Sequence, residues 1–138
     1  DALIIRTSAF FGPWDEYNFV TQMMKHITKG NVFLASSDNV VSPTYVPDLV
    51  NATLDLLIDQ ECGIWHLANP SEITWSDFAI KAAKMAGENH KLIKPCRGEY
   101  IRQIAGRPLY SALGSERGLL LPPLENAMQR YINERILI

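Results

Sequence analysis

The stretch Leu3-Ile4-Ile5-Arg6-Thr7-Ser8 decides the fold class of this 138-residue chain. Its first three residues form a continuous apolar run, which is typical of a parallel β-strand covered on both faces. The polar residues that follow are typical of a loop, and α/β sheets bind ligands at the carboxyl ends of parallel strands. We therefore expect a buried strand at residues 3–5, whose neighbouring strands would come from outside this chain, and a candidate ligand loop after it.

Helices and short strands alternate along the rest of the chain. Apolar residues at helical spacing, with Gly or Pro near the ends, predict helices at residues 17–29, 47–59, 75–86 and 124–137, and shorter helical pieces at 99–105 and 115–118. Short strands or extended segments are predicted at residues 32–35, 40–45, 63–68 and 92–93. Within the helix at 47–59, the residues expected to face the core are Leu49, Val50, Leu54 and Leu57.

This alternation indicates the α/β class, in the form of an α+β-like fragment with few short strands and about four to five helices. We expect a single domain over residues 1–138. The chain begins inside the strand at residues 3–5 and without Met, which indicates an excised fragment.

The composition is that of an ordinary globular protein, with 47% hydrophobic and 20% charged residues. The formal net charge of −2 gives no basic field, so a nucleic-acid partner is not expected. No apolar run approaches the roughly 20 residues that a membrane helix needs, so a membrane partner is not expected either. Cys62 and Cys96 lack CxxC spacing and the three His residues are scattered, which indicates a cytoplasmic protein with free thiols and no metal site.

The sequence lacks the motifs of the common catalytic and cofactor-binding sites. It contains no GxGxxG, GxxxxGK[ST], HExxH or GxSxG pattern, and no Tyr is followed by Lys four residues later. We therefore predict no catalytic residue in this chain, and whether the protein is an enzyme stays open. The remaining candidates for a site are three polar loops beside apolar segments, at residues 6–13, 42–49 and 106–111.

These loops belong to an ordered series of motifs. The series begins with Arg-Thr-Ser-x-x-Phe-Gly at residues 6–12, Asn-Phe at 18–19 and Asp-x-x-x-Ser-Pro-Thr-Tyr-x-x-Asp-Leu at 38–49. It continues with Gly-x-Trp-His-Leu-Ala-Asn-x-x-x-x-Thr-Trp at 63–75, Arg-Pro-x-Tyr-Ser-x-Leu at 107–113 and Leu-Pro-Pro at 121–123. It resembles the C-terminal half of the dTDP-4-dehydrorhamnose reductases, a family of the extended short-chain dehydrogenase/reductase group. The resemblance implies the sugar-nucleotide-binding portion of a Rossmann-type, NAD(P)H-dependent protein that reduces a 4-keto sugar nucleotide.

The resemblance also implies what the rest of such a protein supplies. In this family an N-terminal Rossmann domain binds NAD(P)H, and a Tyr-x-x-x-Lys pair carries out the proton transfer. Both precede the part that resembles this chain, so NAD(P)H would be bound by the full-length parent and not by this fragment alone. The expected partners of residues 1–138 are therefore a sugar nucleotide of the dTDP-sugar class and the missing Rossmann domain.

Ten residues match positions that the resemblance assigns to substrate binding: Ser8, Ala9, Phe10, Asn18, Phe19, Val41, Ser42, Pro43, Thr44 and Arg107. Ser8 and Ala9 match the loop that faces the nicotinamide and the sugar. Many members have Trp in place of Ala9, so either the sugar differs or a neighbouring Phe fills the space. Arg107 carries a planar guanidinium that suits diphosphate oxygens. Gly106 stands where the family often has a second Arg, so one contact is lost.

Structural roles remain open for several of these residues. Asn18 is suited either to capping a helix or to touching a ligand at the helix N-terminus. For Phe10 and Phe11 the alternative is packing in the core. For Pro43 and Thr44 it is setting the direction of the chain into the next helix, and for Arg107 it is a solvated position on the surface. Trp65, His66 and Trp75 are interpreted as packing residues, and only one of the neighbours Trp65 and His66 need face inward.

Two other functions stay open beside the reductase interpretation. An epimerase or dehydratase of the same group would share the fold, and a non-catalytic regulatory or scaffold subunit would keep the fold without the chemistry. An uncovered apolar strand also predicts a homodimer through the exposed strand or helix surface.

Overall fold

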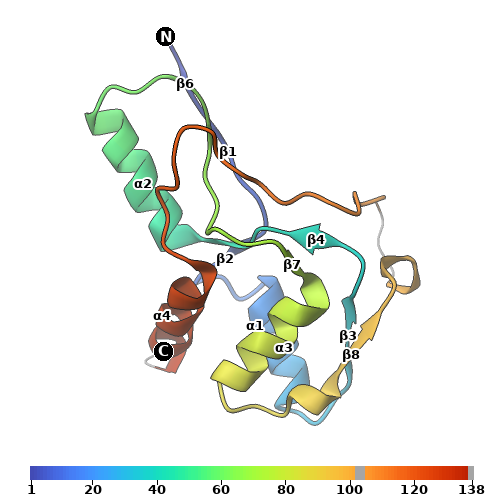
Figure 1. The fold of residues 1–138 in the computed structure, drawn as a ribbon. Coiled ribbons are helices and arrows are strands. Elements are labelled where there is room, and N and C mark those ends of the chain that lie inside the picture. Colours follow the sequence, from blue (N-terminus) through green and yellow to red (C-terminus); the bar gives the residue numbers. More distant parts are fainter. Residues whose placement is uncertain (102–104, 137–138) are drawn as a thin grey trace.

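The computed structural model describes residues 1–101 and 105–136 (Figure 1). The α-helices within these ranges are α1 Phe19–Ile27, α2 Val46–Ile58, α3 Trp75–Met85 and α4 Leu124–Ile136. The strands are β1 Leu3–Arg6, β2 Phe10–Phe11, β3 Phe33–Ser36, β4 Val40–Val41, β5 Thr44–Tyr45, β6 Gly63–His66, β7 Ile73–Thr74 and β8 Ile93–Cys96. Two short 3₁₀-helices are η1 His90–Leu92 and η2 Gly98–Tyr100. The expected α/β class is confirmed.

The strands pair two by two. β1 pairs in parallel with β6, β2 with β5 and β3 with β8, while β4 pairs antiparallel with β7. The expectation that β1 finds its neighbours only outside the chain is wrong, because β6 runs beside it in register, from Leu3 opposite Gly63 to Arg6 opposite His66. Within the described residues, the other edge of β1 pairs with no strand.

Helices α1, α3 and α4 pack around one large apolar cluster, which we call the helical region (Figure 1). Phe11 lies at its centre. The centroid of its ring is 5.3 Å from that of Tyr45 and 5.5 Å from those of Phe78 and Tyr131. Aromatic pairs at this spacing stabilise a core beyond the area they bury. The apolar stripe predicted for the first helix is confirmed, since its buried residues are Val20, Met23, Met24 and Ile27.

Strands β1 and β6 with helix α2 form a smaller unit, which we call the sheet region. It extends away from the helical region in Figure 1. Its core is formed by Ala52, Leu56, Trp65, Leu67 and Leu121. Trp65 is buried while His66 is half-buried, so only one of these neighbours faces inward, as predicted.

The inward face of α2 differs from the prediction. Leu49 is half-buried against the core of the sheet region, but Val50, Leu54 and Leu57 are 48%, 51% and 56% exposed. The buried residues of this helix are Asp48, Ala52 and Leu56 instead. Apolar residues occur on two faces of α2, and the β1–β6 pair covers only one of them, so periodicity indicated the wrong face.

A buried polar network joins the two regions. The fully buried Asn69 accepts a hydrogen bond from the Tyr45 backbone N–H at 2.7 Å, and its Nδ2 donates to Asp48 Oδ2 at 3.0 Å and to the Pro122 carbonyl at 2.9 Å. Asp48 also accepts from Arg130 Nη2 at 2.7 Å, which links the start of α2 to α4. This hydrogen bond from the guanidinium raises the pKa of Arg130 above its usual value.

Side-chain caps fix the start of two helices. The Asn18 side chain accepts from the Thr21 N–H and begins α1, while the Thr74 side chain accepts from the Asp77 N–H and begins α3. Each cap satisfies one backbone donor that the first helical turn leaves unpaired. The caps therefore fix the positions of Phe19 and Trp75, the first residues of α1 and α3.

The structure differs from the two predictions of short helical segments, at residues 99–105 and 115–118. The helical turn predicted at 115–118 is wrong, since the backbone only bends there. A single isolated turn gains too few hydrogen bonds to offset the cost of nucleation. The helix predicted at 99–105 is a 3₁₀ turn, Gly98–Tyr100, and residues 102–104 and 137–138 lie outside the described residues. In the described part of the chain, no helix is long and apolar enough to cross a membrane.

Candidate functional site

A cavity of about 620 Å³ lies where the helical region meets β3 and the loops at residues 8–9 and 107–111. Small-molecule sites have volumes of roughly 300–1,000 Å³. The lining comes from the loop after β1, the starts of α1 and α3, β3, β4 and the segment around residue 108. Segments far apart in the sequence thus converge on one concave surface.

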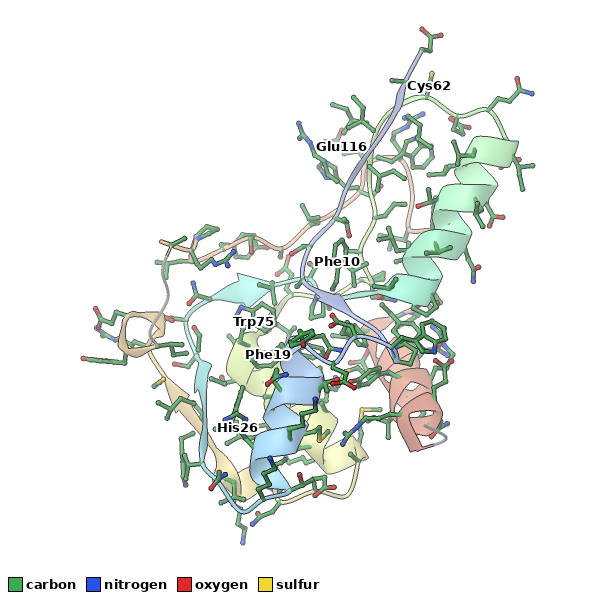
Figure 2. All side chains as sticks on the ribbon, turned by 180° about the vertical axis from the view of Figure 1, so that it is seen from behind. Phe10, Phe19, His26, Cys62, Trp75 and Glu116 are labelled. Atoms are coloured by element: carbon green, nitrogen blue, oxygen red, sulfur yellow. The ribbon has the colours of Figure 1, made fainter. Side chains whose placement is uncertain are left out.

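One wall of this cavity is aromatic. Phe19 and Trp75 are the first residues of α1 and α3, and their ring centroids lie 4.5 Å apart. Phe33 of β3 adds a third ring, 5.6 Å from that of Phe19. Figure 2 shows Phe19 and Trp75 together at the adjoining ends of their helices. Because the caps fix where the helices begin, the two rings have a defined place from which to contact a flat ligand group.

The loop after β1 turns sharply at the cavity. Ala9 has a positive φ of 46°, which a residue with a Cβ rarely adopts. Its carbonyl accepts a hydrogen bond from the Thr44 N–H at 2.9 Å, and the following Phe10–Phe11 segment pairs with β5. These bonds hold the strained turn in place, so Ser8 and Ala9 line the cavity.

The charge of the cavity comes from the segment that follows residue 106. Arg107 is the one charged residue among the described lining residues, and Pro108 and Ser111 lie beside it. This segment is tied to β4, since Val40 N–H donates to the Leu109 carbonyl at 2.8 Å and Ser111 N–H donates to the Val40 carbonyl at 2.9 Å. A guanidinium near an aromatic wall suits a ligand with a flat group and an anionic group.

Two titratable groups beside the lining residues Asn39 and Ser111, namely Asp38 and Tyr110, keep their ordinary charge at neutral pH. The backbone N–H of Gly98 and the hydroxyl of Ser36 donate to Asp38 and lower the pKa of its carboxyl. A hydrogen bond to Glu72 at 2.7 Å raises the pKa of Tyr110. Among the described residues there is no cluster of three or more His, Cys, Asp or Glu that could hold a metal ion. The cavity therefore offers stacking, hydrogen bonds and one cation to a ligand.

Comparison with known proteins identifies the family of the chain. The sequence model of the family described as RmlD substrate binding domain matches residues 1–135. The chain belongs to this family. It is a substrate-binding domain of the dTDP-4-dehydrorhamnose reductase type.

Curated relatives of this RmlD-type domain include a polysaccharide biosynthesis protein and dTDP-4-dehydrorhamnose reductases. The spore coat polysaccharide biosynthesis protein SpsK of Bacillus subtilis is 31% identical over 98% of this chain and 48% of its own length. The dTDP-4-dehydrorhamnose reductase of Mycolicibacterium smegmatis is 31% identical over 85% of this chain and 36% of its own length. The chain thus spans about half the length of such relatives, or less.

Solved structures show the same fold. The dTDP-4-dehydrorhamnose reductase from Bacillus anthracis, in complex with NADP, superposes with a TM-score of 0.86 at 29% identity, over 96% of this chain and 48% of that one. The ortholog from Clostridium acetobutylicum gives a TM-score of 0.87 at 26% identity, over 95% of this chain and 48% of that one. A dTDP-glucose 4,6-dehydratase at 15% identity shares the fold alone. The comparisons do not favour the epimerase, dehydratase or scaffold alternatives.

Half of the residues predicted from the sequence line the cavity of the RmlD-type domain. These residues are Ser8, Ala9, Phe19, Val41 and Arg107. They come from four separate segments that the fold brings together. Phe10, by contrast, lies outside the cavity lining and is 51% exposed, while its neighbour Phe11 is a core residue.

The other four predicted residues are engaged in structural contacts. Asn18 caps α1, and its Nδ2 donates to the carbonyls of Gly12 at 3.1 Å and Asp15 at 2.6 Å. Ser42 donates to the Ser71 carbonyl at 2.6 Å and accepts from the Leu113 N–H at 3.0 Å. Pro43 and Thr44 are fully buried beside it. Their substrate-binding role stays a prediction, since these side chains lie outside the cavity lining.

Nine of the fourteen described lining residues were not among the predicted site residues, and Trp75 and Asn39 are two of them. Trp75 packs against the core of the helical region, as predicted, and it also forms part of the aromatic wall. The signal was available, since Trp75 directly follows the capping Thr74 at the end of a recognised motif. Asn39 carried no signal of its own beyond its place inside the motif at 38–49.

Proposed function

We propose that this chain binds the nucleotide diphosphate part of a dTDP-sugar, as the substrate-binding domain of an NAD(P)H-dependent reductase that acts on a 4-keto sugar nucleotide. The observation that carries the proposal is the cavity itself, whose lining includes the rings of Phe19 and Trp75 and one cationic residue, Arg107. A thymine base is flat and a diphosphate is anionic. Stacking and charge-assisted hydrogen bonding are the interactions that those two groups seek.

The chain's own residues bind and orient the nucleotide, and the hydride would come from NAD(P)H. A cofactor of this kind needs a glycine-rich turn between a strand and a helix for its pyrophosphate. The sequence has no GxGxxG pattern, and the described loop after β1 leads into β2 rather than into a helix. Residues of this chain do not fit the pyrophosphate of the cofactor, so another part of the reductase would hold it.

The sheet region is the surface on which that other part would pack. Parallel sheets are normally covered on both faces. Here one edge of β1 is free among the described residues, Ile4 and Ile64 are 50% and 46% exposed, and the outer face of α2 is apolar. The competing arrangement is a homodimer through the same surface. Sedimentation of the protein at increasing concentration tests it, since a persistent monomer would argue against the dimer.

Titration calorimetry tests the nucleotide proposal. We expect dTDP to bind more tightly than thymidine, because only dTDP offers phosphate oxygens to Arg107. Arg107→Ala should weaken dTDP binding about 10- to 100-fold, the usual effect of losing a charge-assisted hydrogen bond, and should leave thymidine binding nearly unchanged. Arg135→Ala, a change of the same type near the end of α4, is the matched control. Equal affinity of dTDP for the wild type and Arg107→Ala would remove the phosphate role.

A further inference from the structure

The motif at residues 38–49 begins with a turn whose Asn39 lines the candidate cavity. β3 ends at Ser36, whose Oγ lies 2.8 Å from Asp38 Oδ1 and 2.6 Å from Asn39 Oδ1. The Asn39 backbone N–H donates back to Ser36 Oγ at 3.1 Å. Ser36 and Asn39 are buried, at 2% and 7% exposure. The turn is therefore held by its own side chains, and Asn39 has a single orientation in which its amide nitrogen points outward from it.

That amide nitrogen reaches the segment that carries the cavity's cation. Asn39 Nδ2 donates to the carbonyl of Pro108 at 2.9 Å, and Pro108 directly follows Arg107. Because Pro108 has no N–H and a fixed φ, the backbone on either side of it has little freedom once its carbonyl is held. The hydrogen bond from Asn39 thus restrains the backbone one residue after the Cα atom that carries the Arg107 side chain.

The same turn also holds a second segment against the site. Asp38 Oδ1 accepts from the Gly98 backbone N–H at 2.8 Å. Gly98 packs so closely that a Cβ at this position would lie 2.3 Å from Asn39 Oδ1. The turn therefore stands between two segments, one containing Gly98 and the other containing Arg107.

A second cavity of about 520 Å³ opens beside the first at this place. Asn39, Ile101 and Arg107 line both cavities, and the second one is also lined by Arg97 and by the carboxylates Asp38 and Glu99. Arg107 therefore stands at the junction of an apolar cavity and a more polar one. A ligand with a flat group in the first cavity would bring its anionic part to this junction.

We propose that Asn39 is a positioning residue that holds Arg107 at the junction of the two cavities, so that the guanidinium meets the diphosphate of a bound nucleotide. This inference rests on the proposed function, since it concerns the same ligand. It adds a residue that acts on the ligand through Arg107, by way of the Pro108 carbonyl.

A double-mutant cycle tests the inference, with dTDP and thymidine as probes in titration calorimetry. Asn39→Ala should weaken dTDP binding about tenfold and thymidine binding less than about twofold, because only the phosphate contact depends on Arg107. In the Arg107→Ala background, Asn39→Ala should change dTDP affinity less than about twofold, since the residue through which it acts is gone. Asn31→Ala, at an exposed position with the same side chain, is the matched control and should change neither affinity.

Each remaining outcome decides against the inference in a recognisable way. If Asn39→Ala weakens dTDP and thymidine equally, or weakens dTDP equally with and without Arg107, Asn39 supports the cavity in general and does not position Arg107. If wild-type protein does not bind dTDP, the proposed function fails and the inference with it. Asn39→Asp keeps the side-chain shape and removes the amide donor, so it replaces Asn39→Ala in the same cycle if that variant does not fold. A direct effect of the new carboxylate on the ligand would persist in the Arg107→Ala background, whereas a positioning effect would vanish there.

Discussion

The helical region and the sheet region bury their apolar residues to very different degrees. In the described part of the chain, the core of the helical region contains seventeen buried residues, including Phe11 and Tyr45, whereas that of the sheet region contains five. The helical region covers its core with three helices, but the sheet region has one helix on one side of two strands. The helical region therefore encloses its own core, whereas the sheet region leaves apolar surface that a further domain or subunit could cover.

The exposed apolar residues of the sheet region lie on surfaces that fit this interpretation. Leu54 and Leu57 of α2 and Ile4 and Ile64 of the strands are each about half exposed. Leu3 and Ile5 pack against the core of the sheet region, so Ile4 and Ile64 lie on the other face of the strands, and exposed apolar surface of this kind often marks an interface. The cavity, by contrast, is built mostly on the helical region, where the surrounding core is rigid enough to hold ligand-binding residues in place.

The largest effect is expected from Phe11→Ala in the helical region. Removing a buried Phe ring leaves a cavity among Tyr45, Phe78 and Tyr131, so the free energy of unfolding should fall by about 3–5 kcal/mol. Phe10→Ala, one residue away and half exposed, is the matched control and should cost less than about 0.5 kcal/mol. Urea denaturation of both variants measures the difference. Similar losses for the two variants would mean that Phe11 is not the centre of the core.

A smaller effect is expected from Leu56→Ala in the sheet region. Leu56 is 4% exposed, but the cluster around it is small and open, so the structure can relax and the free energy of unfolding should fall by about 2 kcal/mol. Leu57→Ala, the neighbour that is 56% exposed, should change it by less than about 0.5 kcal/mol in this chain. A larger loss for Leu57→Ala in the same urea titration would show that the outer face of α2 is covered in solution.

The smallest effect concerns an ion pair on the surface of the helical region. Lys81 of α3 contacts Glu125 of α4, and this contact lowers the pKa of the Glu125 carboxyl below its usual value of 4.5. A lowered folded-state pKa adds stability above the ordinary pKa, and that stability is lost as the pH falls through the folded-state value. Both side chains are well exposed, so Lys81→Met should cost at most about 0.5 kcal/mol at pH 7.

Thermal unfolding at several pH values measures this contribution. The difference between wild type and Lys81→Met should shrink as the pH falls from about 6 to 3, because protonated Glu125 no longer attracts Lys81. Lys84→Met, on the same helix and without an ion pair among the described residues, is the control. A difference that stays constant with pH would assign the effect of Lys81 to packing.

The helices were predictable because their signals are local. Apolar spacing, a capping Asn18 or Thr74 and a closing Gly identify a helix from a few consecutive residues, and α1 and α3 begin where those caps stand. The partner of β1 was not predictable in this way, since β6 lies almost sixty residues later and pairing across that distance leaves no local pattern. The inward face of α2 failed for a related reason, because a helix with two apolar faces does not state which one its own chain covers.

The candidate site was predictable only in part. Family motifs identified Ser8, Ala9, Phe19, Val41 and Arg107, all of which line the cavity. The same motifs include polar residues, such as Asn18 and Ser42, whose side chains form hydrogen bonds with the backbone. A sequence alone does not distinguish such a structural hydrogen bond from a contact with a ligand. Asn39 acts through the carbonyl of a residue sixty-nine positions away, which only the folded chain brings within reach.

The amide of Asn69, which ties the two regions together, also has a chemical consequence for the lifetime of the protein. Asparagine side chains age by deamidation, when the backbone nitrogen of the next residue attacks the amide carbon. The next residue here is Pro70, whose nitrogen carries no hydrogen and cannot close that ring. Conversion to aspartate would place a second carboxylate beside Asp48 and remove two donors at once. Pro70 thus closes this route of deamidation at Asn69, whose amide hydrogen bonds help to hold the two regions together.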